Sequence, residues 1–429
     1  MAPRIRDGIA IATLGIGLDV SSLCVQFKHM YLKDPSDLLI LSYLDEISVE
    51  ICTKTCILLG TSKEVYGIGL KALTKFEDLC SEGLDQTWHF FQNIYPKQSR
   101  QVTIQDHRGI SMKAVDVLSM YIKHKWQHLW KILPRHYIRE NDVSTVIAVP
   151  IAYLEDAEDI ITSAAEMAGI KEEKMCLVSE PEAIYKYVSI GRKYSHTNWF
   201  SHTDRFSILP GSKLCIANLR SSSGDLTFHK IQGQSLSIPY KTVSGPWGIK
   251  CIVDGFLDIL AEIVGTSVID RFKKQTPAEY EEFVQSMAQS ITSYSSRYYA
   301  ERDLRLKLSS ALIEFCQIEH SLAFREILQK SPYSSQITVK YDKMLIAGNI
   351  LDRYFQGATS TITEHVKENL LEGCGGLKTF MILTGEFVYF EEIKNTLLPN
   401  LSSLGVQTTV IPSDEYPVLK GANIFGWVR

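Results

Sequence analysis

Apolar and polar residues alternate along several short stretches near the start of the chain, a pattern typical of strands with one buried face. These stretches cover residues 9–18 and 23–27, and again residues 55–59 and 65–69 on either side of the sequence GTSKE. Two short apolar runs joined by a polar turn predict a β-hairpin. The first part of the chain is therefore predicted to open with hairpins.

The next stretch, residues 84–133, is interpreted as mostly helical. A strand follows at TVIAVP, and residues 157–168 then place their apolar side chains on one helical face, with Gly169 where a C-terminal cap is expected. The sequence KMCLVSEPEAIYKYV predicts a strand, a turn at Glu180 and Pro181, and another helix. This order predicts a parallel crossover, and hence a mixed sheet covered by helices.

A polar stretch at residues 191–212 is interpreted as a loop between two units, and it contains His196 and His202. The sequence CIANLRSSSGDLTFHKI then alternates on both sides of a polar turn at residues 220–224, which predicts a further hairpin. Helical periodicity follows from about residue 260 to residue 330. The chain continues with a strand at TFMILTG, a helix from Val388 onward, a strand at VQTTVIP and a terminal helix at VLKGANIFGWVR.

Both halves thus begin with a hairpin and end with a helix-covered crossover, which is a coarse internal repeat. We predict an α/β protein of two similar lobes around a central cleft. Lobe I covers residues 1–190 and lobe II residues 191–429, with a helical subdomain at about 260–370.

Composition narrows the classes of protein. The 429 residues include 45 Lys and Arg against 49 Asp and Glu, so the formal charge is −4 and neither nucleic acid nor a membrane surface is expected as a partner. Nine cysteines, an odd number, favour reduced thiols and a cytoplasmic location. The apolar run after Arg4 and Arg6 resembles a secretion signal, but Asp7 and Asp19 bracket it, and a buried strand is favoured. No later run reaches the ~18 apolar residues of a membrane span.

Two local motifs are set aside. GIGLKA, residues 67–72, fits a dinucleotide-binding pattern, but it closes a predicted hairpin rather than the first strand of a βαβ unit. Cys52 and Cys56 lack a second ligand pair at zinc spacing, which favours buried thiols over a metal site.

Several segments are more informative together. The first half contains VIAVP, AAEMAGI and VSEPEA, and the second contains LPGSKLCIANLRSSSGDLT, GPWG at residues 245–248 with Asp254 and Phe256 nearby, GEF at residues 385–387, and KGANIFG. Their order and spacing resemble the actin-like ATPase fold of actin, sugar kinases and the 70-kilodalton heat-shock proteins, and within it the divergent heat shock 70-kilodalton protein 12 branch. The resemblance runs from about Ile9 to Gly426. It implies two pseudo-symmetric lobes of mixed sheets, and ATP or ADP with Mg²⁺ as the family's ligand.

In the resembled family, the motif DxGGGTxDLT is the second phosphate loop, whose glycines let backbone amides approach the phosphates while the aspartate holds Mg²⁺ through water. In this chain an asparagine stands at the aspartate position, and its neutral amide cannot supply the negative charge that a hydrated Mg²⁺ requires. Side chains also occupy the space that the family's glycines leave open. We therefore expect this loop to have lost its phosphate and magnesium chemistry, and no metal site is expected. The corresponding positions here are Asn218, Leu219, Arg220, Ser221, Ser222 and Ser223.

The other implied nucleotide contacts also depart from the family. The first phosphate loop, DxGTT, aligns with GLDVSS, which gives Asp19, Ser21 and Ser22, although a second register places Ala12 at the aspartate position. Gly248 and Gly385 are retained, but Glu386 replaces a glycine near the adenosine, where a carboxylate is expected to repel phosphate. Glu319 and His320 align with the Lys and Arg that a helix of the relatives offers to the adenosine.

Two residues each have two possible interpretations. Glu180 resembles the glutamate that positions the attacking water, but shaping the turn and capping the next helix is the favoured role. Arg220 could hold an anion with its guanidinium, although a solvated arginine in a turn is favoured.

The preferred hypothesis is a heat-shock-70-like protein with degenerate phosphate loops, a pseudo-ATPase that acts as a binding or scaffold protein for an unidentified protein partner. No β-sandwich peptide-binding domain is expected after the closing helix, so a refolding role is not expected. The alternative is an ATP-binding protein with slow ATPase or ATP-gated switch activity. A third reading, an unrelated two-lobed enzyme, requires the ordered match to be chance.

Overall fold

The computed structural model describes most of the chain. The described ranges are 9–33, 39–40, 43–44, 49–50, 52–92, 94–95, 102–133, 138–154, 158–190, 210–233, 235–295, 303–371 and 378–428. Most of the predicted polar loop, with His196 and His202, lies outside them. The chain forms two compact units, Met1–Phe206 with Asp414–Arg429, and Ser207–Ser413.

The first unit is built on a six-stranded mixed sheet in the order β13-β12-β1-β2-β3, with β6 also paired to β2. Strand β1 is antiparallel to β2 and parallel to β12, which is parallel to β13. The predicted opening hairpin and the parallel crossover are therefore confirmed. The strands are β1 (Ala10–Ile16), β2 (Val20–Phe27), β3 (Leu39–Ile40), β6 (Cys52–Lys54), β12 (Val143–Val149) and β13 (Met175–Ser179).

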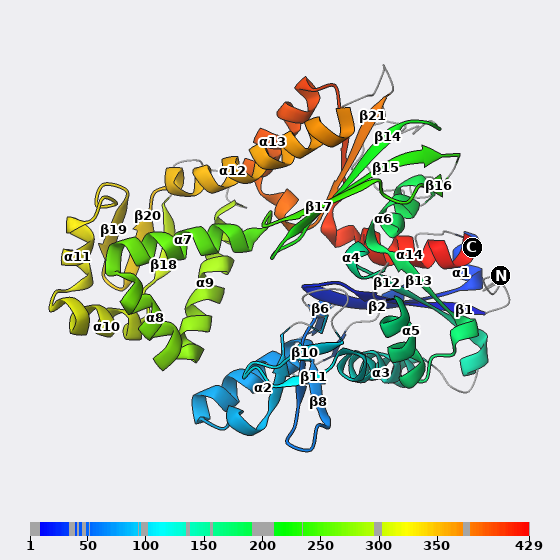
Figure 1. Cartoon of the computed structure of the whole chain (residues 1–429), viewed down its shortest axis with the longest axis horizontal. Coiled ribbons are helices and arrows are strands. Elements are labelled where there is room, and N and C mark those ends of the chain that lie inside the picture. Colours follow the sequence, from blue (N-terminus) through cyan, green and yellow to red (C-terminus); the bar gives the residue numbers. More distant parts are fainter. Residues whose placement is uncertain are drawn as a thin grey trace. The chain divides into compact units, whose positions relative to one another are not determined.

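Helices cover both faces of this sheet, with α3 (Ala114–Ile132) and α5 (Glu158–Met167) on one face and α6 (Glu180–Ser189) and α14 (Pro417–Val428) on the other (Figure 1). Alternate side chains of β1 serve the two faces, because Ala12 and Leu14 pack in the core with α3 while Ile11 packs with α14. Short helices α1 (Lys28–Lys33) and α4 (Ile151–Leu154) complete this part.

The terminal helix α14 belongs to the first unit, whereas the sequence pattern predicted it in lobe II. Its Asn423 is completely buried and donates hydrogen bonds from Nδ2 to Ile11 O (3.2 Å) and Thr13 Oγ1 (3.0 Å). Gly421 lies so close to α6 that an added Cβ would be 1.8 Å from Ala183 O. These contacts join the two ends of the chain in one core.

A smaller layer of the first unit holds a three-stranded sheet, β8-β7-β9, with helix α2. The hairpin of β7 (Ile57–Leu59) and β8 (Val65–Ile68) is confirmed, and the GIGLKA motif runs from β8 into α2 (Gly69–Glu82). The interpretation of residues 84–133 as mostly helical is wrong before Ala114, because that stretch contains β9 (His89–Phe91), β10 (Thr103–Gln105) and β11 (Ser111–Lys113). Two further short strands pair with each other, β4 (Tyr43–Leu44) and β5 (Val49–Glu50).

The second unit contains another six-stranded mixed sheet, in the order β16-β15-β14-β21-β22 with β17 paired to β15. The hairpin predicted around residues 220–224 is confirmed as antiparallel β14 and β15. The strands are β14 (Lys213–Leu219), β15 (Gly224–Gln232), β16 (Ser235–Leu236), β17 (Lys241–Gly245), β21 (Thr379–Thr384) and β22 (Gln407–Val410). Together with the first sheet and its helices, this confirms the mixed α/β class.

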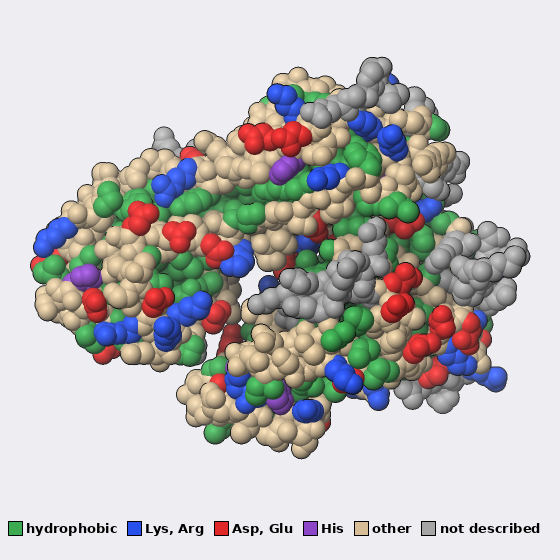
Figure 2. Space-filling model, viewed as in Figure 1, with side chains coloured by type: hydrophobic (Ala, Val, Ile, Leu, Met, Phe, Trp, Pro, Cys, Tyr) green, Lys and Arg blue, Asp and Glu red, His purple; other side chains and the backbone are tan. Residues whose placement is uncertain are grey.

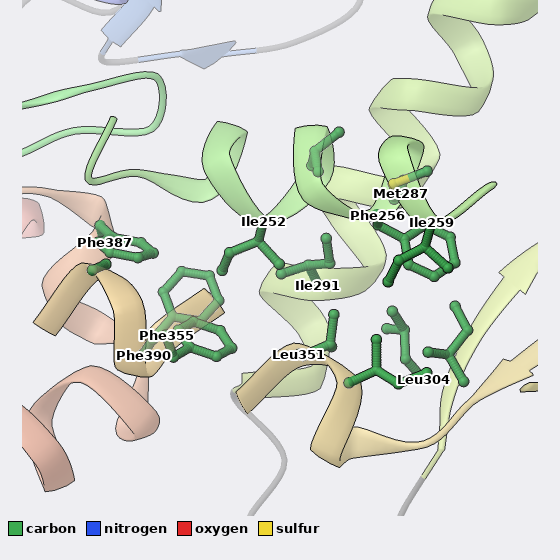
Figure 3. Packing of buried hydrophobic residues seen from close by; sticks show 14 of the residues in the cluster. Ile252, Phe256, Ile259, Met287, Ile291, Leu304, Leu351, Phe355, Phe387 and Phe390 are labelled. Carbon is green, nitrogen blue, oxygen red and sulfur yellow. The ribbon is translucent and has the colours of Figure 1, made fainter. Parts of the chain in front are cut away.

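Helices extend from this sheet into a largely helical part, where side chains of α7, α9 and α12 point toward one another (Figure 3). The predicted helical subdomain, residues 260–370, also contains a three-stranded sheet, β18-β20-β19, that was not predicted from the sequence. In it, β18 (Leu304–Lys307) buries only Leu304 and Leu306, a pattern too short to identify from sequence. The helices are α7 (Ile249–Val264), α8 (Thr266–Gln275), α9 (Pro277–Ser295), α10 (Ser310–His320), α11 (Phe324–Lys330), α12 (Gly348–Val366) and α13 (Glu391–Ser403), and the other strands are β19 (Ile337–Lys340) and β20 (Lys343–Ile346).

A single carboxylate holds the start of α10. Glu279 of α9 accepts hydrogen bonds at Oε1 from Ser309 Oγ (2.7 Å), Ser310 Oγ (3.0 Å) and the Ala311 N–H (3.0 Å). Negative charge is favourable at a helix N-terminus, where backbone N–H groups lack helical partners.

Candidate functional site

The β14–β15 hairpin of the second unit is closed by its own side chains. Its turn is fixed by a hydrogen bond from the Arg220 N–H to Ser223 O (2.9 Å). The Arg220 side chain is buried and turns back, so that Nη2 lies 2.5 Å from Oδ2 of Asp225. Ser244 Oγ, on the neighbouring strand β17, donates to the other carboxylate oxygen of Asp225 (2.6 Å). The guanidinium is therefore part of an internal network and not a solvated group at the tip.

The remaining predicted residues of this loop take different positions. Asn218 lies within β14 opposite Asp225 of β15 and is buried. Ser221, Ser222 and Ser223 form the half-buried tip. Arg220 also donates from Nη2 to Ser223 Oγ (3.3 Å).

The two glycines predicted from the resemblance, Gly248 and Gly385, both touch this hairpin. A Cβ on Gly248 would lie 2.4 Å from Ser221 O, and the Lys250 N–H, in the first turn of α7, donates to the same oxygen (2.9 Å). Gly385 has φ +101°, a conformation that favours glycine, and an added Cβ would lie 2.1 Å from Leu219 O. The glycines thus provide close approach to the protein's own backbone carbonyls.

The other predicted adenosine contacts lie in the second unit and have structural partners. Glu386 is half-buried in a 3₁₀ turn after β21. Glu319 of α10 accepts from Ser267 Oγ (3.2 Å), and its carboxylate lies 3.9 Å from Arg271 of α8. The Nε2 atom of His320 lies 2.7 Å from Val264 O. The last two side chains connect α10 to α8 and to the end of α7.

In the first unit, the predicted first phosphate loop is the turn between β1 and β2. The Gly17 N–H donates to Val20 O (3.0 Å), which leaves Asp19 inside the turn. Ser21 and Ser22 belong to β2, where they pair with Ile16 and Gly15. Ser21 Oγ is buried and hydrogen-bonded to the hydroxyl of Tyr121 on α3.

Glu180 lies beside this turn. It is the first residue of α6, only 5% exposed, and its Oε1 lies 3.2 Å from the position of a Cβ on Gly17. The side-chain cap of α6 is Ser179, which accepts from the Glu182 N–H (3.3 Å), so helix capping does not explain the Glu180 carboxylate. Burial, and next the charge of Glu180, raise the pKa of the Tyr95 hydroxyl, which donates to Ile16 O (2.7 Å).

Several residues of these two sites were not predicted from the sequence. Asp225 could have been identified from the sequence, since it occupies the position of the second aspartate in the DxGGGTxDLT motif. Trp247 was quoted only within the GPWG turn, yet it is 3% exposed and packs against Gly224 and Gly245. Tyr95 and Tyr121 carry no sequence signal for contact with the β1–β2 turn, because each is distant along the chain.

Within the described ranges, no three His, Cys, Asp or Glu side chains gather as a metal ion requires. In the same ranges, no helix has both the length and the apolar character to cross a membrane.

Comparison with known proteins agrees with the resemblance found in the sequence. The chain is 22% identical to human heat shock 70 kDa protein 12B over 87% of its own length and 62% of that protein's length. It is 21% identical to human and 20% identical to mouse heat shock 70 kDa protein 12A, over 87% of this chain and 63% of each relative. The chain thus spans less than two thirds of these relatives. No family model matches it.

Proposed function

Because the chain is a divergent heat-shock-70-like protein related to heat shock 70 kDa proteins 12A and 12B, we propose that it is a pseudo-ATPase that acts as a binding or scaffold protein. The observation that supports this proposal is the buried Arg220–Asp225 ion pair, which fills the hairpin that aligns with the second phosphate loop.

A triphosphate at this hairpin would have to compete with the ion pair. Drawing the guanidinium toward a phosphate would leave the Asp225 carboxylate with Ser244 but without its cation, and breaking a buried ion pair in this way costs about 3–5 kcal/mol. A phosphate placed beside the Asp225 carboxylate would also add repulsion between two negative charges. The pair therefore works against phosphate binding in a way that a solvated arginine would not.

Magnesium would also lack its usual ligand. Mg²⁺ is bound in proteins through one or two carboxylates together with substrate phosphates. Asn218 offers a neutral amide at the aligned position, and the Asp225 carboxylate opposite it is already bonded to Arg220 and Ser244. The residues of this hairpin do not fit a hydrated Mg²⁺–triphosphate.

The backbone donors near the hairpin support the same conclusion. Phosphate loops hold their ligand with N–H groups that point outward at a glycine-rich turn or a helix N-terminus. Here the Lys250 N–H of α7 is bonded to Ser221 O, and the Arg220 N–H to Ser223 O. These donors already stabilise the closed hairpin.

The test is calorimetric titration of the protein with ATP and ADP, with and without Mg²⁺. We expect no Mg²⁺-dependent micromolar binding by the wild type, and a gain of binding in the double variant Asn218→Asp with Arg220→Gly. Lys250→Gln is the matched control, because its exposed side chain pairs only with Asp254 in the part that the structure describes (2.7 Å) and lies next to the hairpin. Magnesium-dependent micromolar binding by the wild type, strengthened by Asn218→Asp alone, would refute the proposal.

The position of Glu180 favours the alternative, an ATP-binding protein with slow hydrolysis or an ATP-gated switch. A buried carboxylate against the β1–β2 turn is suitably placed to orient a water molecule near a phosphate. This alternative predicts a measurable ATPase rate that is lost in Glu180→Gln. No turnover in the wild type excludes hydrolysis, and a rate that Glu180→Gln leaves unchanged points to a contaminating enzyme.

A further inference from the structure

The outward face of α3 is basic from its third turn to its end. Asp116 lies in the first turn, and the acidic and basic side chains after it on this helix, from Lys123 onward, are all lysines or histidines. His124, His128 and Lys131 are spaced by four and three residues, so they share one face of the helix. Lys131 is exposed, and both imidazoles are half-buried.

Helix α2 adds a further cation next to this face. Lys71 is exposed, and its Nζ lies 5.4 Å from the centre of the Tyr66 ring on β8. Burial, and next the positive charges of Lys131, His128, Lys71 and Lys125, lower the pKa of His124 to about 4. Among the described residues, the charged groups that shift this pKa, from α3 and from α2, are all cationic. We call Lys71, His124, His128 and Lys131 the α2–α3 basic face.

This concentration of positive charge contrasts with the chain as a whole, which carries a formal charge of −4. In Figure 2, Lys, Arg and His side chains are scattered among hydrophobic and uncharged ones over the part of the first unit that Figure 1 labels α2, β8 and α3. Positive charges that share a surface repel one another, and an anion placed among them relieves the repulsion.

We propose that the α2–α3 basic face is a docking site for an acidic peptide segment of a partner protein. Its carboxylate or phosphoryl groups would lie between Lys71 of α2 and the row of His124, His128 and Lys131 on α3. The α2–α3 basic face would bind the peptide whether or not a nucleotide is bound, since none of its residues belongs to the candidate nucleotide site.

The dimensions favour a peptide over a larger polyanion. From residue 124 to residue 131 the helix rises about 10 Å, which an extended peptide spans with about three residues. Tyr66 beside Lys71 and Ile132 at the end of α3 are 39% and 41% exposed, so apolar surface borders the charges. A duplex or a bilayer would instead favour a broad basic surface, which the acidic net charge of this chain argues against.

The proposal predicts the sign of a pH effect. An acidic segment favours the protonated form of His124, so the pKa of this imidazole rises on binding from its low value in the free protein. Binding then takes up a proton, and affinity increases as the pH falls from about 7.5 to about 5.5, a range in which Asp and Glu of the peptide remain ionised.

The experiment is fluorescence anisotropy of a labelled Glu-rich peptide titrated with the nucleotide-free protein, beside its Gln-substituted counterpart and a phosphoserine version. We expect the Glu and phosphoserine peptides to bind and the Gln peptide not to bind. The double variant Lys71→Glu with Lys131→Glu should weaken binding by about tenfold or more, because two attractions become repulsions. The control is Lys340→Glu with Lys343→Glu, an equal charge reversal on the exposed β19–β20 hairpin of the second unit.

The outcomes separate the sources of binding. Equal loss in both double variants would show a response to net charge alone and would overturn the proposal. Tighter binding of a single-stranded oligonucleotide or of phosphatidylserine vesicles than of the Glu-rich peptide would overturn the assignment to peptide. A pH response that persists unchanged in His124→Gln with His128→Gln would remove the imidazoles from the site. Because no nucleotide is present, these results do not depend on whether ATP binds.

Discussion

Lys125 should reduce the stability of the protein, and its replacement by methionine should increase it. The side chain lies on the inward face of α3 and is completely buried, with Nζ 5.5 Å from the centre of the Tyr121 ring. Burial lowers the pKa of this amine from its ordinary 10.5 to about 7. Methionine has a similar length and no charge, so it fills the same space without this penalty.

The magnitude follows from the pKa change. At about 1.4 kcal/mol for each factor of ten in the equilibrium constant, the difference between 10.5 and about 7 corresponds to roughly 5 kcal/mol at or below pH 7. Favourable contacts of the side chain, among them the one with the Tyr121 ring, offset part of this cost. We therefore expect Lys125→Met to raise the free energy of unfolding by about 1–3 kcal/mol at pH 7.

The direction of the pKa change also determines how the stability of the protein depends on pH. The pKa of this lysine is 10.5 in the unfolded chain and about 7 in the folded protein, so between these pH values the unfolded state binds more protons and wild-type stability increases as the pH rises. The advantage of Lys125→Met should therefore be largest at pH 7 and below, and should fade toward pH 10.

Denaturant titrations of the wild type and the variant at several pH values provide the measurement, with fluorescence of the buried Trp126 and Trp130 on the same helix as the signal. Lys123→Met, at an exposed position of α3, is the control and should change little. A variant no more stable than the wild type at pH 7, or an advantage that stays constant to pH 10, would refute the reasoning.

Two further substitutions test the packing of each unit by thermal and denaturant unfolding. Glu279→Ala should destabilise the second unit by about 1–3 kcal/mol, because the donors at the start of α10 lose their acceptor, whereas Glu282→Ala, exposed on the same helix, should be nearly neutral. Gly421→Ala should separate α14 from α6, since the new Cβ would meet Ala183 O at 1.8 Å. Gly357→Ala, whose added Cβ would meet nothing within 4 Å outside its own helix backbone, should stabilise by about 0.5–1 kcal/mol; destabilisation of similar size at both glycines would contradict this account.

The sequence by itself determined the elements whose pattern is local. The hairpins at β1–β2, β7–β8 and β14–β15 follow from alternation around short polar turns, and α5 from its apolar face and the glycine after it. The resemblance to the heat shock 70 kDa protein 12 relatives also rests on motifs in sequence order, and the comparisons confirm it.

The elements that sequence reasoning missed carry weak local signals. Strands β9, β10 and β11 have three residues each, and β18 has four. A segment of this length does not repeat its pattern often enough to distinguish a strand from part of a helix, and pairing with distant strands decides it.

Only the tertiary structure decided the roles of the charged residues. The sequence placed Arg220 in a turn, but the pairing of β14 with β15 brings it to Asp225 and makes it an internal partner. In the sequence, Lys125 is one of several basic residues on α3 with nothing to distinguish it. The packing of α3 against the core buries this lysine completely. Both outcomes have the same physical reason. The free energy of a charged side chain depends on its exposure to solvent and on the partner that the fold places beside it. The residues next to it in the sequence determine neither its exposure nor its partner.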